Sequence, residues 1–497
     1  MTKLKSSLIV SLLFLLLPVV CFAQTTSSTS AVTGTVTDPT GAVVAGATVT
    51  LVDSKTSQER TTTTNDRGVY SFAQVPPGQG YSLKFTATGF ETLELSGIAL
   101  GVGNAETHNA QLTVGQVSTS VVVTAEAGAT LNTTDASIGN VIEERRMKEL
   151  PIAIRSSPAS LIGLQPGVIG NNVGTGATNR VGSVTGSRAD QGNITVDGID
   201  ANDQATGQAF ATTGNAPIDA IQEFRTVTAN PAASEGRSSG GQIELITKSG
   251  TNDWHGSLRE FNRTAATTAN SFFNNRSGIE RPQLTRNQYG GSIGGPLYFP
   301  HFGEGGPTLF NGKDKLFFFF DYEARRDAQG VSYTRTVPLP HFRNGSLAFV
   351  NAGCPTNSRL NTSPQCITIL TPAQVAALDP LHIGGNQALL SFVNQRYPLP
   401  NDLTLGDGIN TGGFRFNAPS LRADNNYTGR VDWNISNAQR LFVRTSKISA
   451  NQTDTVNNVA AQFPGDPETA QIITGDYAIA VGHNWTATPN FVNSATV

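Results

Sequence analysis

Apolar and polar residues alternate with a period of two along most of the chain, which predicts strands rather than helices. Between residues 31 and 113 the alternation comes in short runs, such as Val32–Thr37, Ala47–Val52 and Tyr81–Phe85. Turn-forming residues separate the runs, as at Asp38–Gly41. This spacing predicts a small antiparallel β-sandwich of Ig-like or prealbumin-like type.

A second pattern occupies residues 128–252. Val141–Glu149 has the composition of a helix that ends before Pro151, and Ser160–Leu164 predicts a second short helix. A Gly- and Asn-rich stretch over residues 170–186 predicts a loop. Three short strands with Gly- and Asn-rich turns follow, so a small α+β unit is expected, with only strands after it.

The three strands lie between Asn193 and Asn252. In the first, Ile194 and Val196 share one face and Asp197-Gly198 forms the turn. Four acidic residues of this stretch, Asp197, Asp200, Asp219 and Glu223, could be taken for paired catalytic acids. Because no base, nucleophile or metal ligand accompanies them, we expect structural roles at turns and strand ends.

After Asn252 the alternating segments lengthen to roughly ten residues, apolar on one side and polar on the other, with aromatic residues near their ends. This pattern is typical of transmembrane β-strands, and residues 253–497 are therefore predicted to form part of an antiparallel barrel. The clearest apolar faces are Leu316, Phe318, Phe320 and Tyr322, opposite Phe317, Phe319, Asp321 and Glu323, and Tyr427, Val431, Trp433 and Ile435, opposite Thr428, Arg430, Asp432 and Asn434. Residues 338–424 predict a long irregular extracellular loop.

The first 23 residues predict an export signal. Lys3 and Lys5 precede an apolar run, Leu8–Val20, and a small residue, Ala23, stands at the expected cleavage site. The run is shorter than the ~20 residues that a transmembrane helix needs. A lipoprotein signal at Cys21 is the weaker alternative, because Val20 is bulky where a small residue is expected.

Composition excludes several classes of protein. The net charge is −3 and only 14% of the residues are charged, so we expect no nucleic-acid partner. After removal of a signal peptide, Cys354 and Cys366 are the remaining cysteines, and in an oxidising compartment they can form a disulfide. We predict no metal site, no cofactor and no catalytic residues, hence no enzyme.

Several blocks, in order, resemble the plug domain and first barrel strands of TonB-dependent outer-membrane receptors, in particular the Oar-like branch. They are Leu164–Val168, Asp219–Arg225, Gly240–Asn252, Asn287–Pro296 and Lys315–Glu323. One departure lies at residues 230–237, where the family has an aromatic residue beside its Glu-Gly-Arg-like turn. A generic α+β domain is the alternative interpretation of residues 128–252.

The first domain resembles the carboxypeptidase regulatory-like domain, which has a carbohydrate-binding-like sandwich fold. The resemblance rests on Gly34–Asp38, Asp66–Tyr70 and Tyr81–Leu83. It implies no peptidase chemistry, because this region has no His/Glu metal set. Sugar binding would need exposed aromatic residues, whereas we expect the aromatic residues Tyr70, Phe72, Tyr81, Phe85 and Phe90 in the core. A structural or interaction module is therefore expected.

Between the two domains, residues 116–127 form a linker that contains a short β-branched run. In the receptor family a similar run just before the plug is the TonB box, which pairs with periplasmic TonB by β-augmentation. The resemblance implies that Val121, Val122, Val123, Thr124 and Ala125 bind TonB. The alternative is that this run is the last strand of the sandwich.

Together these features lead us to expect a mainly β outer-membrane receptor or transporter that takes up an unidentified ligand, with saccharides and peptides as candidates. Its partners would be TonB and outer-membrane lipid. An adhesion or carbohydrate-binding surface protein without transport is the alternative of a different class. Because the chain ends at Phe491–Val497 in what reads as a strand just begun, we expect the N-terminal part of a longer receptor with an incomplete barrel.

Overall fold

The computed structural model describes most of the chain after the predicted signal peptide, which lies outside the described residues. It covers residues 28–115, 120–124, 136–150, 152, 155, 159–169, 183–188, 191–202, 216–231, 235–236, 240–276, 278–300, 309–354, 364–453, 461–467, 470–488 and 491–497. Four parts can be distinguished: the sandwich (28–115 with 120–124), the plug (136–250), the wall (the long sheet within 255–497) and the loop module (338–411).

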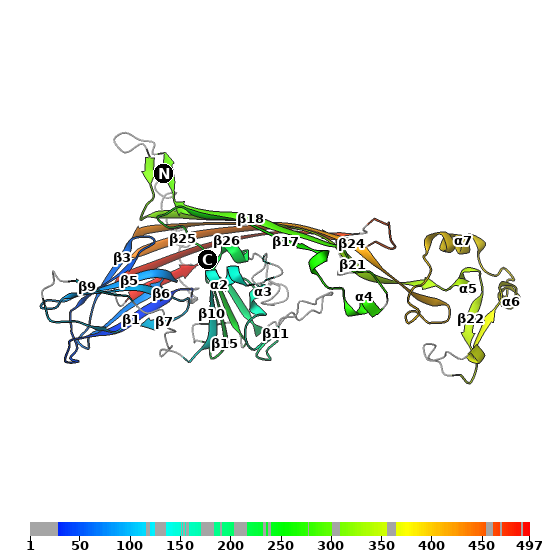
Figure 1. Cartoon of the computed structure of the whole chain (residues 1–497), viewed down its shortest axis with the longest axis horizontal. Helices are drawn as coiled ribbons and strands as arrows, with labels where there is room; N and C mark the ends of the chain where they lie inside the picture. Colours follow the sequence, from blue (N-terminus) through cyan, green and yellow to red (C-terminus); the bar gives the residue numbers. More distant parts are fainter. Residues whose placement is uncertain are drawn as a thin grey trace, which may run out of the picture.

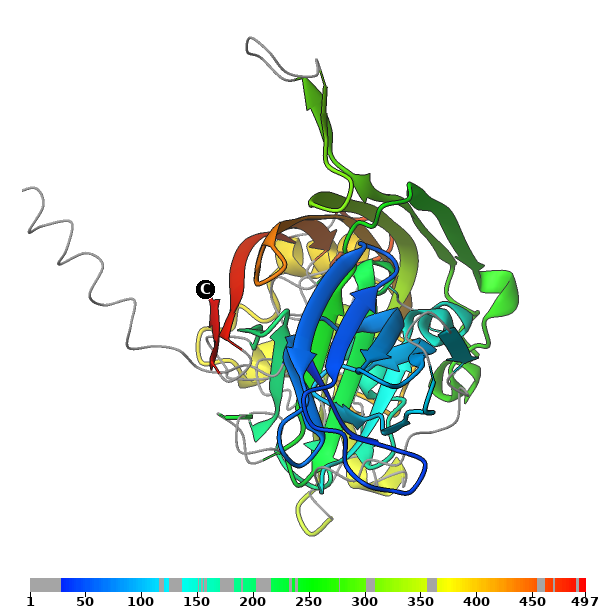
Figure 2. The ribbon, with the colours of Figure 1, turned by 90° about the vertical axis from the view of Figure 1, so that its left-hand side faces the viewer.

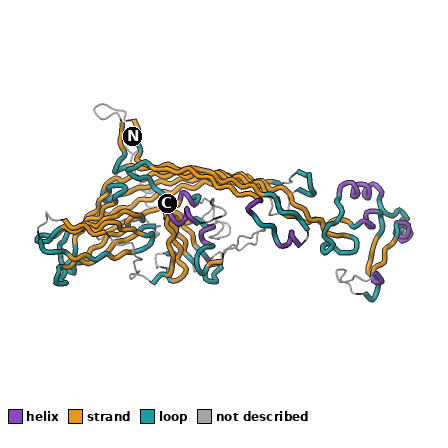
Figure 3. The backbone as a smooth tube through the Cα atoms, viewed as in Figure 1, coloured by secondary structure: helices purple, strands orange, loops and turns teal. Residues whose placement is uncertain are grey.

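The four parts are arranged along the long curved wall. Figure 1 shows the sandwich at one end of the wall, the plug beneath it and the loop module at the opposite end. Viewed from the sandwich end, the wall arches over the plug (Figure 2). Strands make up most of the fold, and the described helices are short and lie in the plug, in the wall connections and in the loop module (Figure 3). None of them is long and apolar enough to cross a bilayer.

The sandwich packs two sheets around an apolar core. One sheet contains β1 (Ser30–Thr37), β4 (Val69–Val75), β7 (Ala105–Thr107) and β8 (Ala110–Gln111), and the other has the order β3-β2-β5-β6-β9. The strands of the second sheet are β2 (Thr48–Asp53), β3 (Gln58–Thr63), β5 (Gly78–Thr86), β6 (Thr92–Leu100) and β9 (Ser120–Thr124).

The inward positions of the sandwich strands are the predicted ones. Val32, Val36, Val49 and Leu83 are buried, and Tyr70, Phe72, Tyr81 and Phe85 lie in the same core. Phe90 is partly buried and packs against it. Because four of these rings are enclosed by the two sheets and Phe90 packs against the same core, they do not form an exposed sugar-binding platform.

The plug is built on a five-stranded sheet with the order β10-β15-β16-β13-β14. Its strands are β10 (Ile138–Glu143), β13 (Asn193–Val196), β14 (Ile199–Asp200), β15 (Ile221–Ala229) and β16 (Gln242–Thr247), with the 3₁₀ turn η3 (Ile218–Ala220) before β15. The strands β13 and β16 run parallel, and the other neighbours are antiparallel. A minor hairpin joins β11 (Val168–Ile169) to β12 (Ser183–Val184).

Both predicted helices of the plug are shorter than expected. The first, α2, spans Glu144–Glu149, because Val141 and Ile142 pair with β15 and Ile142 is buried in the core. Both residues are β-branched and suit a strand, whereas the charged residues that follow them form the helix. The second, α3, spans Ala159–Ile162. Most of the predicted loop, residues 170–182, lies outside the described residues.

The wall is a seven-stranded antiparallel sheet in sequence order, with no crossovers. It contains β17 (His255–Thr264), β18 (Leu284–Pro296), β21 (Leu316–Pro338), β24 (Thr411–Ser436), β25 (Gln439–Thr453), β26 (Gln471–Thr488) and β27 (Phe491–Thr496). Its edge strands β17 and β27 do not pair with each other in the described residues, so the sheet is open.

The two faces of the wall divide as the alternation predicts. Phe317, Phe319, Asp321 and Glu323 are buried on the side that holds the plug. On the other side Phe320, Tyr427 and Trp433 are exposed. The apolar outer face fits a lipid-facing surface, and the polar inner face fits a barrel interior.

The expected irregular loop is in fact an ordered module. β21 and β24 remain paired as far as Pro338 and Thr411, and the module beyond contains α5 (Pro340–Arg343), β22 (Leu347–Val350), β23 (Ile367–Leu370), α6 (Pro372–Leu378) and α7 (Gln387–Arg396). Thr371 and Gln374 form a capping box for α6. These helices, with α4 (Phe272–Arg276), also correct the expectation that only strands follow the plug. A disulfide joins Cys354 to Cys366.

Candidate functional site

The plug meets the wall through buried charges, and the first group is centred on Asp197. This residue occupies the turn between β13 and β14 with a positive φ of 52°, followed by Gly198. Its carboxylate accepts hydrogen bonds from the backbone N–H of Thr247 at 2.9 Å and from the Thr247 hydroxyl at 2.8 Å. The Asp197 side chain is thereby held in one orientation, toward the wall.

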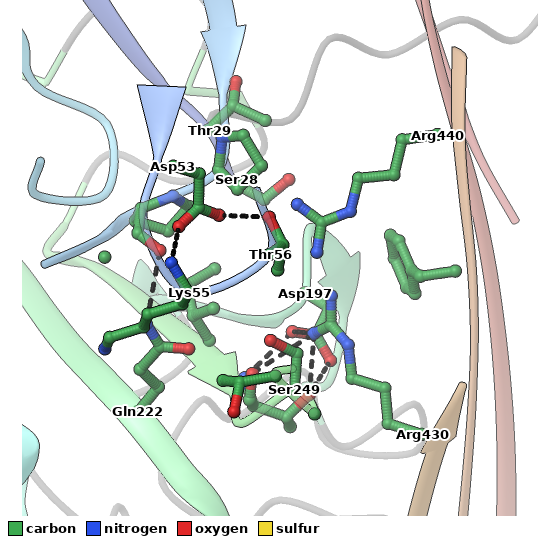
Figure 4. A pocket seen from close by; sticks show the side chains of 18 of the residues that line it. Ser28, Thr29, Asp53, Lys55, Thr56, Asp197, Gln222, Ser249, Arg430 and Arg440 are labelled. Atoms are coloured by element: carbon green, nitrogen blue, oxygen red, sulfur yellow. Dashed lines mark hydrogen bonds and ion pairs between the residues drawn. The ribbon is translucent and has the colours of Figure 1, made fainter. Parts of the chain in front are cut away.

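Two wall arginines reach that carboxylate. Arg430 of β24 donates from Nη1 to Asp197 Oδ1 at 3.0 Å, and Arg444 Nε of β25 lies 2.7 Å from Oδ2 in a charge contact without hydrogen-bond geometry. Arg430 also forms two hydrogen bonds with Asp432 on its own strand, at 2.8 and 2.9 Å. Figure 4 shows Arg430 extending from the wall toward Asp197.

A second group of buried charges is centred on Asp219, in the turn before β15. Arg155 of the plug holds this carboxylate with two hydrogen bonds, at 3.0 and 3.2 Å. From the wall, Arg259 Nε lies 3.4 Å from Asp219 Oδ2. The same guanidinium donates two hydrogen bonds to Asp321 of β21, at 2.8 and 2.9 Å. Arg259 thus joins a carboxylate of the plug to a carboxylate of the wall.

The sandwich contacts the plug through a smaller polar interface. The backbone N–H of Val102 donates to Glu223 Oε1 at 2.7 Å, and Gln222 Nε2 donates to the carbonyl of Pro77 at 3.2 Å. Burial raises the pKa of Glu223 to about 7, and Glu143 and Glu244 nearby act in the same direction, against the Val102 N–H and Arg225. Protonation of one carboxyl group is therefore coupled to contact between the two domains.

A polar pocket lies where the sandwich, the plug and the wall come together (Figure 4). The sandwich contributes Asp53, Lys55 and Thr56, and the wall contributes Arg430 and Arg440. The Asp53 carboxylate accepts a hydrogen bond from the Thr56 hydroxyl at 2.7 Å, and Arg440 donates a hydrogen bond to the Asp432 carboxylate at 2.9 Å. The Asp53 carboxylate and the Arg440 guanidinium are thus bound to protein atoms, and the pocket lies at the interface between the three parts.

The acidic residues singled out in the sequence have structural partners. Asp197 and Asp219 pair with arginines, Glu223 accepts a backbone N–H, and Asp200 accepts from the backbone N–H of Asn202 at 2.9 Å. Within the described part of the chain, no group of three or more His, Cys, Asp or Glu residues is placed to hold a metal ion. What the sequence did not reveal is that Asp197 and Asp219 face the wall arginines.

The TonB-box-like run is described from Ser120 to Thr124, and Ala125 lies outside the described residues. It forms β9 at the edge of the second sandwich sheet, parallel to β6, with Val121 opposite Leu93 and Val123 opposite Leu95. The Val122 side chain is exposed. The backbone thus has the geometry of a last strand of the sandwich, while its outer edge borders no other strand that the structure describes.

Comparison with protein families identifies two regions. The model of an outer membrane beta barrel domain matches residues 246–497, just over half of the chain, and that of a carboxypeptidase regulatory-like domain matches residues 31–113. The TonB-dependent transporter Oar of Myxococcus xanthus is 29% identical over 311 residues, which are 60% of this chain and 26% of that protein. The chain therefore spans about a quarter of the length of this curated relative.

Solved structures of outer-membrane receptors are also similar. The siderophore receptor PirA from Acinetobacter baumannii is 14% identical with a TM-score of 0.28, over 70% of this chain and 54% of that one. The ferric-catecholate import receptor Fiu from E. coli K12 is 12% identical with a TM-score of 0.28, over 71% and 46%. From the match over residues 246–497, the chain belongs to the outer membrane beta barrel domain family, and it is an outer-membrane protein that carries a carboxypeptidase regulatory-like domain at residues 31–113.

Proposed function

We propose that this chain functions in a TonB-dependent outer-membrane receptor that takes up a ligand when the plug moves relative to the wall. The observation that supports this most strongly is the way in which the plug is held. Its contacts with the wall through Asp197 and Asp219 are ion pairs, whereas its sheet is complete without the wall. Among the described residues no strand of the plug pairs with a strand of the wall, so the plug can leave the wall without breaking a backbone ladder there.

Buried ion pairs suit a plug that must be held firmly and then released. While water is excluded, removing one partner leaves an uncompensated charge, which costs about 3–5 kcal/mol. When the interface opens, water solvates both charges and much of their attraction disappears. The contact between Asp197 and the two arginines is therefore strong at rest and weak once a pulling force has admitted water.

The proposed connection to TonB is β9, with Val121, Val122, Val123, Thr124 and Ala125 as the TonB-binding residues. A partner strand can add to the outer edge of β9 by backbone hydrogen bonds while β6 still holds its inner edge. Force applied to β9 would then reach the plug by two routes: along the chain, and through the sandwich contacts at Glu223 and Gln222.

In-cell cross-linking tests the proposed partner. Val122→Cys should form a disulfide-linked product with a cysteine-bearing TonB periplasmic domain, because Val122 is exposed on the edge strand. Val43→Cys, also exposed but remote from β9 in the sandwich sequence, serves as the matched control and should give no such product. Equal products at both positions, or none at Val122, would refute β9 as the TonB contact.

A further inference from the structure

A short hairpin leaves the wall between β18 and β21. Its strands, β19 (Tyr298–Pro300) and β20 (Leu309–Asn311), form a two-stranded sheet of their own in which Phe299 is opposite Phe310. Figures 1 and 2 both show it projecting from the outer side of the wall, away from the plug. The Asn434 N–H donates to the Lys315 carbonyl at 2.7 Å, so the base of the hairpin lies beside the short turn between β24 and β25, and short turns are periplasmic in such barrels.

The direction of the hairpin is fixed at its base. The Gly312 N–H donates to the Leu297 carbonyl at 3.0 Å, and a Cβ at Gly312 would lie only 2.4 Å from that carbonyl oxygen. Asp314 follows with a φ of 62° and exchanges hydrogen bonds of 2.7 and 2.6 Å with the Asn252 side chain. The bend that turns the hairpin outward is therefore part of the fold.

Apolar side chains lie on both faces of the hairpin. The Phe299 and Phe310 rings stack on one face at 4.4 Å between centroids, and Tyr298, Pro300 and Leu309 lie on the other, where Asn311 at the base is the polar member. Tyr298, Phe299 and Leu309 are 36%, 40% and 49% exposed. An isolated two-stranded hairpin is marginally stable in water, and one with exposed apolar side chains on both faces is stabilised by an apolar environment.

The hairpin continues the lipid-facing surface of the wall. Trp254 stacks on Tyr298 at 6.4 Å and meets the edge of Phe318 at 5.5 Å, which connects the hairpin to the outer face of β21. At the same level, Trp433 of β24 pairs with Leu316, and Trp433 and Trp485 of β26 are exposed on the two strands that flank β25. Tryptophan and tyrosine at this position form the aromatic girdle of a membrane interface.

We propose that the hairpin of β19 and β20 is a membrane anchor that binds the phospholipid of the periplasmic leaflet. Its rings lie at the boundary between headgroups and acyl chains, as an extension of the aromatic girdle. Lys313 and Lys315, exposed at its base, face the phosphate layer. The anchor holds the periplasmic rim of the wall, to which the sandwich is attached through the bond from Asn252 N–H to the Lys55 carbonyl, at 2.9 Å.

Photocross-linking in living cells tests this proposal in the full-length protein. Phe299→benzoylphenylalanine should give a phospholipid adduct, detected by mass spectrometry after irradiation. Trp433→benzoylphenylalanine, on the outer face of the wall, is the positive control. Phe349→benzoylphenylalanine, an exposed aromatic position in the loop module at the far end, should give no phospholipid adduct.

A protein adduct at Phe299, or no phospholipid adduct there while Trp433 gives one, would overturn the proposal. Leu309→benzoylphenylalanine repeats the measurement on the opposite face of the hairpin. Because both faces are proposed to contact lipid, a phospholipid adduct is expected at this position too, and its absence would equally contradict an anchor embedded in the leaflet.

Discussion

At the scale of single residues, Asp197 links the plug to two strands of the wall, β24 and β25. It is buried, receives two hydrogen bonds from Thr247 and faces Arg430 and Arg444. Neither arginine could be paired with it from the sequence, because Arg430 lies 233 positions away. The sequence does indicate that Arg430 needs a charged partner, because the alternation in β24 places Arg430 and Asp432 on the inner face. It does not indicate which residue that partner is.

We expect Asp197→Asn to weaken the docking of the plug. The substitution keeps the shape of the side chain but leaves Arg430 and Arg444 with less negative charge, at an estimated cost of about 3–5 kcal/mol. The urea concentration at which the plug becomes sensitive to trypsin should therefore fall. Asp200→Asn, on the exposed end of the same hairpin, is the control and should leave it unchanged. Similar values for the two variants would contradict a role in docking.

The pKa of Glu223 gives a second prediction at this scale. Because burial raises the pKa of Glu223 from 4.5 to about 7, the folded state binds the proton more tightly than the unfolded state. Glu223 therefore contributes its full share to the free energy of unfolding below pH 4.5. This contribution falls as the pH rises toward 7 and is lost above it, a total decrease of up to roughly 3 kcal/mol.

Glu223→Gln should remove this part of the pH dependence, because a neutral amide does not titrate and still offers an oxygen to the Val102 N–H. Urea unfolding of the wild type and the variant between pH 4.5 and 8 measures the pH dependence of the free energy of unfolding. Glu149→Gln, on the exposed face of α2, is the matched control and should keep the wild-type profile. Parallel profiles for wild type and Glu223→Gln would show that this carboxyl group does not link the sandwich to the plug by its protonation.

At the scale of elements, alternation of apolar and polar residues predicted the wall strands and their faces. Phe317 and Phe319 point inward and Phe320 outward, as the period of two requires. The helix prediction was wrong for Val141 and Ile142, two β-branched residues that pair with β15. It also missed α6, although its Thr371 and Gln374 capping pair was readable in the sequence.

Gly250 controls how the chain passes from the plug to the wall. A Cβ at Gly250 would lie 2.3 Å from the Phe318 carbonyl oxygen and 2.7 Å from that of Gly295. Gly250→Ala should therefore push the connection away from β18 and β21 and cost about 1–3 kcal/mol. Gly236→Ala is the control, because no heavy atom lies within 4 Å of a Cβ added at Gly236. The urea concentration at the midpoint of unfolding measures the stability of both variants. Equal midpoints for the two would refute the close packing of Gly250 against the Phe318 and Gly295 carbonyl groups.

The edge strand β9 should bind TonB through its backbone. Val122→Pro and Val123→Pro each remove one N–H, and because successive N–H groups point to opposite edges, one change affects the β6 side and the other the outer side. Both should reduce cross-linking to TonB, whereas Val122→Ala, which keeps the backbone donor, should retain it. Undiminished cross-linking in both proline variants would exclude β9.

At the scale of the whole molecule, the sequence predicted the order of the parts but not how they contact one another. The sandwich core is local, because its buried residues all lie between Val32 and Leu112, whereas the plug core also includes Phe319 of the wall. Contacts between parts depend on a few distant side chains, such as Arg60, which donates to Thr486 at 3.1 Å. Such contacts leave no periodic signal in the sequence, which is why they were not predicted.

A local core implies that the sandwich is an independent folding unit. Residues 28–115, produced alone, should unfold in one cooperative thermal transition, because both sheets bury their apolar faces against each other. Differential scanning calorimetry tests this, with equal calorimetric and van't Hoff enthalpies expected. A broad transition with a much smaller van't Hoff enthalpy would mean that the sandwich depends on its contacts with the plug.

The central claim is that TonB moves the plug away from the wall, and the accessibility of a buried plug residue measures that movement directly. Thr247 is 1% exposed and donates to Asp197 beneath Arg430. In energised cells, Thr247→Cys should react with a membrane-impermeant maleimide faster when TonB is present than when it is deleted, while the exposed Val43→Cys reacts equally in both. A Thr247→Cys labelling rate that does not depend on TonB would contradict the proposed mechanism.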